Sequence, residues 1–415
     1  MFLSTDRKIE KMKKILYIAF ACNPYVGSEA QCGWSWPINM RNYAEVSIVT
    51  RKENKNDIEK YFEANNISNI KVYYHDIPDS INLYYKFGKM YLVYYYLWQK
   101  TIYRLIKTLH YKNNYDYIHH VTLGDFRLIS PAWKLNTKFI FGPVGGAQLT
   151  PKSLAEYAKK DWREEYKRKI INKFVVSLPN YRKAINKAFL VLAANEETRE
   201  VISNKIKKQE KCILLTENGI NSSQIKKTYT KKINKQVVLL WSGRIVNRKG
   251  LYFLIDVLEK LKCKNEFVLK IVGDGPEKEF LKDKVKKLRM ENKVQFIGKV
   301  TYEKMQEIYS TSDIFVFPSL RETTGTVLFE AMVNRLPIVT FNQNGAALLI
   351  DDKCGYKIDV MQPIEKIKID FADRLKNLID NPSITIKMGE AAYKRVIENY
   401  EWGEKCKKFY EMYIK

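Results

Sequence analysis

Several features that would assign this 415-residue sequence to a large protein class are missing. Its six cysteines are scattered, without the two-residue spacing of zinc or thiol redox sites, which fits a reducing cytoplasm. No apolar run reaches the length of about 18 residues that a membrane-spanning helix needs, and the short apolar run at 15–21 predicts a strand rather than a signal peptide. The sequence also contains no Asp-x-Asp triplet and no recognisable nucleic-acid-binding module.

What the sequence has in excess is positive charge. Its 72 lysines and arginines against 46 acidic residues give a formal net charge of +26. Such a surface attracts nucleic acids, anionic membranes or acidic substrates such as nucleotide sugars. Lysine, isoleucine, asparagine and tyrosine are all abundant, so a general compositional bias contributes as well. The charge alone therefore leaves these partners open.

Short apolar strands alternate with helical stretches along the chain. A chain of this length is expected to form two domains of about 200 residues each. The pattern predicts two doubly wound, Rossmann-like α/β domains, at 1–220 and 237–397, joined by a polar linker at 221–236. Ligands of such folds bind at the C-terminal ends of the strands, so the residues after each strand are the site candidates. Strands are predicted at 15–21, 46–50, 70–74, 117–122, 139–141, 189–195, 237–241, 267–273, 294–298, 313–318 and 336–341.

Two glutamates lie around a predicted helix start in the second half. Residues 314–317 predict a buried strand, and the segment after Gly325 is apolar on nearly every face. Glu330 lies inside that helix, where a carboxylate is costly to desolvate without a partner. We therefore expect Glu330 to meet a ligand hydroxyl or an internal donor. Glu322 precedes Gly325 at the end of the same strand.

A basic turn follows the strand at 237–241. Gly243 lets the chain turn, and Arg244, Arg248 and Lys249 stand at or just before a helix start. Free backbone N–H groups, the helix dipole and a guanidinium together favour binding of a diphosphate. A solvated basic turn is the alternative interpretation.

Tight glycine turns end two further strands. In the GDGP turn, Gly273 and Asp274 precede a helix that is expected from Pro276. In the first half, Gly27 and Ser28 expose backbone donors at a helix start, with Ser28 as the predicted N-cap. Each turn could cradle a phosphate or simply begin a helix.

The strand at 117–122 contains two adjacent histidines near its end. Because side chains alternate along a strand, only one of His119 and His120 is expected to face a cleft. A lone histidine at a strand end is more often structural. The glycine-rich sequence GPVGGA at 142–147 predicts a close approach of the backbone to a helix or to a ligand.

These motifs follow one another in an order that resembles a known family. From SGRIVNRKG through GDGP and FIG to ETTGTVLFE, the chain resembles a retaining glycosyltransferase of the GT-B superfamily, of the family-4 type that builds bacterial polysaccharides and glycolipids. The motifs CNPYVGSEAQCGW, IHHVT, DFR and GPVGGA are similar to a subgroup that assembles exopolysaccharide or capsule. The resemblance implies two domains that face an interdomain cleft, with a C-terminal helix at 398–415 that packs back on the first domain.

The resemblance also implies roles for the site candidates. Arg244 and Lys249 would hold the donor diphosphate and stabilise charge on the leaving nucleotide, and Glu330 would accept hydrogen bonds from the ribose hydroxyls. Gly325 and Thr326 would offer N–H groups to the phosphates. The implied catalytic set is Glu322, His119, His120, Arg244 and Lys249. The implied donor-binding set is Gly27, Ser28, Gly243, Arg244, Lys249, Gly273, Asp274, Gly325, Thr326 and Glu330.

Sugar transfer in this family implies a reaction without a cofactor. Glu322 would contact hydroxyls of the transferred sugar, and one of His119 and His120 would contact the sugar or assist the reacting centre. The leaving phosphate would help to deprotonate the acceptor on the same face of the sugar. No metal is expected, because arginine and lysine take its place. The sequence departs from the family at Thr324, where many relatives carry an aromatic residue, and at 344–345, where they carry paired glycines.

Residues 83–107 interleave tyrosine, tryptophan and leucine with lysine and arginine. This pattern suits a membrane interface and an isoprenoid- or lipid-linked saccharide acceptor, while a core helix with a basic outer face is the alternative. The sequence thus predicts a cytoplasmic glycosyltransferase, peripheral on the inner face of the cytoplasmic membrane, that binds a nucleotide-sugar donor and no nucleic acid. A non-catalytic binder of nucleic acid or polyanionic glycan and a GT-B-fold nucleotide-sugar epimerase are the competing hypotheses.

Overall fold

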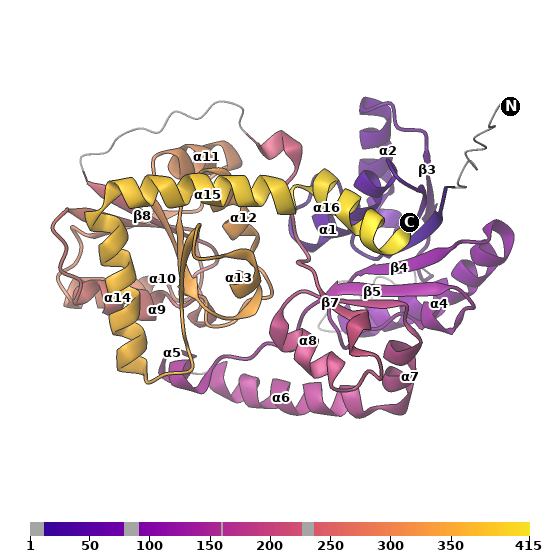
Figure 1. Ribbon diagram of the computed structural model, residues 1–415, viewed down its shortest axis with the longest axis horizontal. Helices are drawn as coiled ribbons and strands as arrows, with labels where there is room; N and C mark the ends of the chain where they lie inside the picture. The colour runs from indigo at the N-terminus through magenta and orange to yellow at the C-terminus, as the bar shows by residue number, and fades with distance from the viewer. Residues whose placement is uncertain (1–11, 79–90, 159–160, 226–235) are drawn as a thin grey trace, which may run out of the picture. The chain divides into compact units, whose positions relative to one another are not determined.

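Two parallel β-sheets with flanking helices make up the part of the chain that the computed structural model describes, which is residues 12–78, 91–158, 161–225 and 236–415 (Figure 1). The chain divides into two compact units. Unit 1 comprises Met1–Gly142, Ala184–Val191 and Lys405–Lys415, and unit 2 comprises Pro143–Lys183 and Leu192–Glu404. Most of the predicted linker at 221–236 lies outside the described residues, so the predicted domain boundaries stay predictions.

The first sheet has seven strands in the order β3-β2-β1-β4-β5-β6-β7. β1 pairs in parallel with β2 on one side and with β4 on the other. β3 pairs in parallel with β2, and β5 pairs in parallel with β4. The strands are β1 Lys14–Ala19, β2 Glu45–Thr50, β3 Ile70–Tyr74, β4 Tyr117–Thr122, β5 Lys138–Val144, β6 Leu190–Ala193 and β7 Cys212–Leu214. The helices of the first half of the chain are α1 Glu29–Met40, α2 Lys55–Ala64, α4 Tyr91–Asn113, α5 Ala155–Ala158, α6 Trp162–Ser177, α7 Pro179–Lys187 and α8 Glu196–Ser203.

The second sheet has six strands in the order β10-β9-β8-β11-β12-β13, and each neighbouring pair runs in parallel. Its strands are β8 Val237–Ser242, β9 Phe267–Val272, β10 Val294–Gly298, β11 Ile314–Phe317, β12 Ile338–Phe341 and β13 Gly355–Ile358. The helices of the second half of the chain are α9 Leu251–Glu259, α10 Lys278–Lys287, α11 Tyr302–Ser310, α12 Thr326–Val333, α13 Asn344–Leu349, α14 Ile364–Asp380, α15 Pro382–Tyr400 and α16 Trp402–Phe409. Two doubly wound parallel sheets confirm the predicted α/β fold class.

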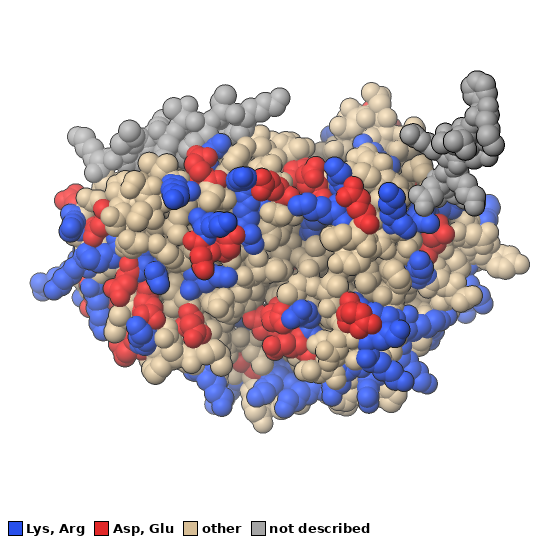
Figure 2. Space-filling model, in the orientation of Figure 1, with Lys and Arg blue, Asp and Glu red and all other residues tan. Residues whose placement is uncertain are grey.

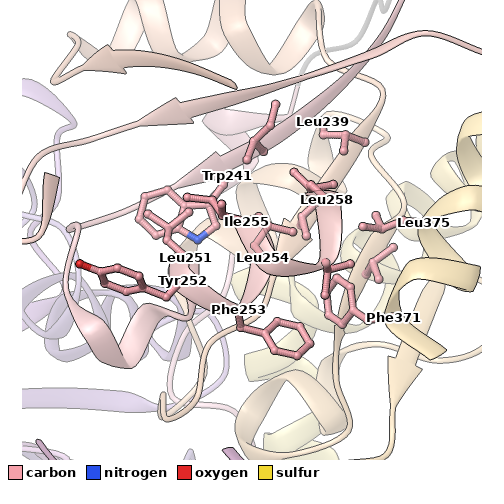
Figure 3. Close-up of a cluster of buried hydrophobic side chains, with 14 of the residues drawn as sticks. Leu239, Trp241, Leu251, Tyr252, Phe253, Leu254, Ile255, Leu258, Phe371 and Leu375 are labelled. Atoms are coloured by element: carbon pink, nitrogen blue, oxygen red, sulfur yellow. The ribbon is translucent and has the colours of Figure 1, made fainter. Parts of the chain in front are cut away.

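The main core of unit 2 forms around α9, where apolar residues recur at helical spacing at 251, 254, 255 and 258. Trp241 of β8 and Phe371 of α14 lie in the same buried cluster, which Figure 3 shows from close range. Side chains on almost every face of α9 are buried, which is typical of a helix that is covered by a sheet on one side and by further helices on the other. Leu251, Leu254, Ile255 and Leu258 of α9 are all buried.

The C-terminal residues of the chain belong to unit 1. The Tyr117 hydroxyl donates a hydrogen bond to the Ile414 carbonyl at 3.1 Å. The rings of Phe409 and Trp36 meet edge to face at 5.2 Å between centroids. These contacts attach the end of the chain to β4 and α1.

Helix α4 covers much of the segment at 83–107, for which the sequence leaves open a membrane interface or a core helix with a basic outer face. Residues 83–90 lie outside the described part of the chain, and α4 begins at Tyr91. Tyr94, Tyr95 and Trp98 pack against Phe20 in the interior, with ring centroids 5.0 to 5.7 Å apart. The described aromatic residues of this segment thus serve mainly as core, while the lysines face outward. Among the described helices, none is long and apolar enough to cross a membrane.

Candidate functional site

A pocket of about 780 Å³ lies at the C-terminal ends of three neighbouring strands in unit 2. The loops after β8, β9 and β10 form one side, and α11 and α12 form the other. In a doubly wound sheet this edge is where ligands bind, because the backbone N–H groups and the strand-end side chains converge there. The lining residues are Ser242, Gly243, Arg244, Val272, Gly273, Asp274, Gly275, Lys299, Val300, Thr301, Tyr302, Met305, Val327 and Glu330.

Two glycine turns pack against each other at the base of the pocket. Gly273 has a φ of +132°, and a Cβ atom at this position would lie 1.9 Å from the Gly243 carbonyl oxygen. The Ile245 N–H donates to the Asp274 carbonyl at 2.9 Å, which fastens the turn after β8 to the turn after β9. A residue other than glycine at 273 would force these turns apart, so the backbone itself requires the first glycine of GDGP.

Asp274 has partners of its own within the GDGP turn. Its carboxylate accepts the Gly275 N–H at 2.8 Å and lies 3.5 Å from the Lys278 ammonium. The backbone hydrogen bond and the lysine lower the pKa of Asp274. The predicted helix start at Pro276 is wrong by two residues, because Pro276 and Glu277 form a turn and α10 begins at Lys278.

Glu330 has the internal donor that its apolar helix requires. The Tyr309 hydroxyl, from α11, donates a hydrogen bond to Glu330 Oε2 at 2.8 Å, and Ser242 Oγ lies 3.5 Å from the same hydroxyl. Burial raises the pKa of Glu330, and the Tyr309 hydrogen bond partly offsets this by stabilising the carboxylate. A carboxylate offers about four acceptor sites, so one hydroxyl donor leaves Glu330 free to bind further hydroxyl groups in the pocket.

Glu322 forms an ion-pair cluster with two residues of the basic turn. Its Oε2 contacts the Lys249 ammonium and lies 3.1 Å from Arg248 Nη1. Burial alone would raise the pKa of Glu322, but the two cations outweigh it and the pKa is lowered. The Leu320 N–H also donates to the Arg248 carbonyl at 2.8 Å, so the two loops are tied together. Lys249, predicted to bind the diphosphate, is therefore engaged by Glu322, and neither residue lines the pocket.

Gly325 and Thr326 begin α12 as predicted. Gly325 has a φ of +90°, and a Cβ there would lie 2.8 Å from the Phe317 ring. Thr326 is the first residue of the helix, where backbone N–H groups have no intrahelical acceptor. The neighbouring Thr324 is buried, and in the part of the chain that the structure describes its hydroxyl has no hydrogen-bond partner.

At Gly145 the GPVGGA segment closely approaches another loop of unit 2, whereas the sequence predicted a helix or a ligand there. A Cβ at Gly145 would lie 2.3 Å from the Thr323 methyl group, and Gln148 Nε2 donates to the Thr323 hydroxyl at 3.0 Å. Gly345, one of the positions that departs from the family pattern, donates its N–H to the Thr323 carbonyl at 2.8 Å. Thr323 is thus surrounded by backbone and amide groups.

Gly27 and Ser28 lie in unit 1, at the start of α1. A Cβ at Gly27 would have open space around it, so no close approach requires a glycine there. Ser28 occupies the N-cap position with a φ of +59°, but its side chain makes no capping hydrogen bond, contrary to our prediction. Glu29 instead accepts the Gly124 N–H at 2.6 Å, and burial raises the pKa of this carboxyl group.

Both histidines of β4 are buried in unit 1, so the prediction that one would face a cleft is not met in the described structure. His119 Nε2 lies 2.7 Å from the Gly142 carbonyl, to which it can donate, while His119 Nδ1 has no partner among the described residues. His120 Nδ1 accepts the Ser130 N–H at 3.3 Å, and its Nε2 lies 2.9 Å from the Tyr95 hydroxyl. Burial lowers the pKa of His119 to about 4 and that of His120 to about 3, so both imidazoles are neutral at pH 7.

Sequence reasoning missed two residues of this region, Tyr309 and Lys299, and the partner of a third, Arg248. Tyr309 and Lys299 contribute to the pocket or to its carboxylate, and Arg248 shares Glu322 with Lys249. The sequence shows Arg248 only as part of a basic turn. Its ion pair with Glu322 forms because two loops come together in the folded chain. No local pattern marks Tyr309 or Lys299. Within the described residues, no group of three His, Cys, Asp or Glu side chains is placed to hold a metal ion.

The second half of the chain matches a known family. Residues 222–395 match the model of the glycosyl transferases group 1. An uncharacterized glycosyltransferase from Methanocaldococcus jannaschii is 24% identical over 241 residues, covering 54% of this chain and 59% of that protein. The alpha-D-kanosaminyltransferase of Streptomyces kanamyceticus is 29% identical over 163 residues, covering 39% of this chain and 41% of the relative. The chain thus matches less than two thirds of the length of each of these relatives.

A solved structure resembles the chain over nearly its full length. HepE from Anabaena, in complex with UDP and glucose, has a TM-score of 0.59 at 16% identity and covers 96% of this chain and 98% of its own. At this identity the likeness concerns the fold, and it agrees with the two parallel sheets described above. Residues 222–395 are thus similar to the glycosyl transferases group 1, and the chain as a whole has the GT-B fold.

Proposed function

We propose that the chain is a retaining glycosyltransferase of the family-4 type. It would move a sugar from a nucleotide-diphospho-sugar to a saccharide or lipid-linked saccharide acceptor during assembly of a cell-surface polysaccharide. The observation that carries this proposal is the pocket in which Arg244, Lys299 and Glu330 converge at the strand ends of unit 2. HepE, which is similar in fold, holds UDP and glucose in its solved complex.

The pocket offers complementary groups for each part of a nucleoside diphosphate. Glu330, held by Tyr309, would accept hydrogen bonds from the two ribose hydroxyls. Val272, Val300 and Val327 supply apolar surface for a base. Arg244 is exposed at the pocket and suits the paired oxygens of a diphosphate.

The first turn of α12 and the cluster around Glu322 would bind the reacting end of the donor. The N–H groups at Gly325 and Thr326 point from a helix start, which favours phosphate oxygens. Glu322 is kept ionised by Lys249 and Arg248, and a carboxylate is the natural acceptor for hydroxyls of the transferred sugar. In this proposal Lys249 acts by fixing Glu322 as well as by its positive charge.

The proposed reaction is a transfer on one face of the sugar. The bond between the anomeric carbon and the diphosphate oxygen breaks, the acceptor oxygen bonds to the same face, and the leaving phosphate takes the acceptor proton. Arg244 and Lys299 would stabilise the negative charge that develops on the diphosphate, so the proposal requires neither a metal nor a cofactor. The proposal gives neither histidine a sugar contact, because His119 and His120 are both buried in unit 1.

We place the proposed reaction in the cytoplasm, at the inner face of the membrane, where the net charge of +26 favours anionic carriers and surfaces. The activity test incubates the protein with UDP-, GDP- and ADP-hexoses and saccharide or lipid-linked acceptors, with and without EDTA. We expect one donor to give a glycoside whose anomeric configuration, read by NMR, equals that of the donor, at an EDTA-independent rate. An inverted product would contradict retention. An epimerised nucleotide sugar without any glycoside would contradict transfer itself.

A further inference from the structure

Helix α6 has its polar and apolar faces reversed relative to an ordinary surface helix. A helix that packs on a protein normally buries its apolar side chains and exposes polar ones. On α6, the buried side chains include Glu165 and Asn172, and the most exposed ones include Tyr166 and Phe174. The reversal needs an explanation on each face.

The inner face is polar because it binds a polar stretch of backbone. Glu165 accepts the Thr150 N–H at 3.1 Å and pairs with Arg321 at 2.8 Å. Arg168 and Asn172 donate to the Gly146 carbonyl at 3.3 and 3.5 Å, and Asn172 also donates to the Ala147 carbonyl at 3.3 Å. These bonds hold the helix firmly in unit 2, so its outer face is presented at a fixed orientation.

The outer face carries a continuous apolar stripe. Tyr166, Ile170 and Phe174 follow one another at four-residue spacing, which places them on one side of the helix, and they are 68%, 52% and 64% exposed. Ile171 and Leu178 widen this stripe and are 47% and 38% exposed. Large apolar side chains gathered in this way mark a surface that contacts something other than water.

Basic residues surround the stripe. The exposed cations on α6 are Arg163, Lys167, Lys169 and Lys173, against a single exposed acidic residue, Glu164, which pairs with Lys167 at 2.7 Å. In Figure 2 lysine and arginine side chains gather along the lower edge of the view, where α6 lies in Figure 1.

We propose that the outer face of α6 docks on an anionic phospholipid bilayer, with Tyr166, Ile170 and Phe174 inserted at the level of the headgroups. An interfacial helix lies in the membrane plane with aromatic and aliphatic side chains below and lysines above, at the anionic headgroups. A second copy of the chain fits less well, because two faces of the same positive charge would repel each other. This inference goes beyond the transferase activity, and its test measures binding to vesicles and not turnover.

Another exposed apolar group lies at the start of α4, where Leu92 and Tyr96 are 61% and 56% exposed. It adjoins residues 79–90, which are outside the described part of the chain, and the neighbouring Tyr94, Tyr95 and Trp98 of α4 are buried. The described contacts therefore favour α6 as the docking helix over the segment at 83–107.

The test is flotation of the full chain with phosphatidylcholine vesicles, with and without phosphatidylglycerol. We expect binding only to the vesicles that contain phosphatidylglycerol, weakened by high salt because exposed charges are screened. The double variant Ile170→Glu/Phe174→Glu should bind at least about tenfold more weakly, since two anchors become charged. Reversal of two flanking charges in Lys169→Glu/Lys173→Glu should also weaken binding, and more so at low salt.

A matched control comes from the same chain. Ile386 on α15 and Phe280 on α10 are 54% and 65% exposed, close to the values for Ile170 and Phe174. The variant Ile386→Glu/Phe280→Glu should keep wild-type binding, and thermal unfolding should show that all three double variants are folded. Equal binding by Ile170→Glu/Phe174→Glu and Ile386→Glu/Phe280→Glu, or no binding of the wild type to either vesicle, would overturn the proposal. So would a dimer in sedimentation that the α6 variant alone dissociates, because a second copy would then cover this face.

Discussion

The end of β4 in unit 1 and the pocket in unit 2 both carry polar side chains near the C-terminal ends of parallel strands, and they differ in how those side chains are bonded. His120 uses both ring nitrogens internally, and His119 lies in the interior with one nitrogen bonded to Gly142. Glu330 has a hydroxyl donor and retains acceptor sites, and Arg244 is exposed at the pocket. A position at a strand end is therefore not sufficient for a site. Unused hydrogen-bonding capacity at an accessible surface is the better criterion.

The largest expected effect comes from the glycine turns that shape the pocket. Gly273→Ala should destabilise the protein by about 3 kcal/mol or more, since the methyl group meets the Gly243 carbonyl and φ is positive. Urea unfolding measures this, and calorimetry should find that nucleotide binding is lost. Gly298→Ala is the control, because Gly298 also has a positive φ but a Cβ there meets nothing within 4 Å. Equal destabilisation by both variants would show that the contact between the turns does not matter.

A slightly smaller loss of stability is expected at β4. His120→Leu leaves the Ser130 N–H and the Tyr95 hydroxyl without their imidazole partner and should cost about 2 to 4 kcal/mol. His119→Leu should cost less, since only one nitrogen of His119 is bonded. Urea unfolding of the two variants compares them directly. The reverse order of destabilisation would contradict the bonding pattern described above.

The same histidines predict how stability depends on pH. In the folded protein the pKa values of His119 and His120 are about 4 and about 3, below the ordinary value of about 6.5. At a pH between the folded and the ordinary values, the unfolded chain therefore binds more protons than the folded protein does. The stability that the neutral imidazoles contribute is therefore complete above about pH 6.5, and it is lost as the pH falls toward the pKa values of the two histidines in the folded protein. His120→Leu should make this part of the stability profile shallower. A profile of unchanged slope would mean that His120 does not titrate on unfolding.

In the pocket the expected effects are on affinity. Glu330→Gln should weaken nucleotide binding about tenfold, which corresponds to about 1.4 kcal/mol and to the loss of charge-assisted hydrogen bonds. Tyr309→Phe removes the hydroxyl that lowers the Glu330 pKa, so this pKa rises further. Because the carboxylate is the binding form, nucleotide affinity should then begin to fall at a higher pH than in the wild type. Calorimetry over a pH series tests the shift, and Glu330→Gln should abolish it.

The smallest effect is expected for one exposed cation. Arg244→Ala should weaken nucleotide binding a few-fold, about 1 kcal/mol, because Lys299 remains in the pocket. The salt dependence of binding should become shallower, since one charge that faces the diphosphate is gone. Arg104→Ala is a matched control, because Arg104 is an exposed arginine on α4 and does not line the pocket.

The sequence predicts more of the fold than of the candidate site. The strands at 70–74 and 117–122 have the predicted bounds, and the buried face of α9 follows its apolar spacing, because both depend on local periodicity. The need of Glu330 for a donor could be predicted from its apolar helix. The donor itself, Tyr309, could not, because it comes from another helix. Likewise the pairing of Lys249 with Glu322 depends on two loops that meet only in the folded chain.

The most direct test is calorimetric titration of UDP, GDP and ADP into the wild type and into an Arg244→Ala/Glu330→Gln double variant. A second double variant, Arg104→Ala/Glu63→Gln, makes the same chemical changes at exposed positions on α4 and α2 and serves as the control. We predict that one nucleotide binds the wild type and the control equally, that EDTA has no effect, and that the pocket variant loses binding by about two orders of magnitude. Equal binding by all three proteins, or no binding of any nucleotide to the wild type, would contradict the assignment of the unit 2 pocket as the donor site.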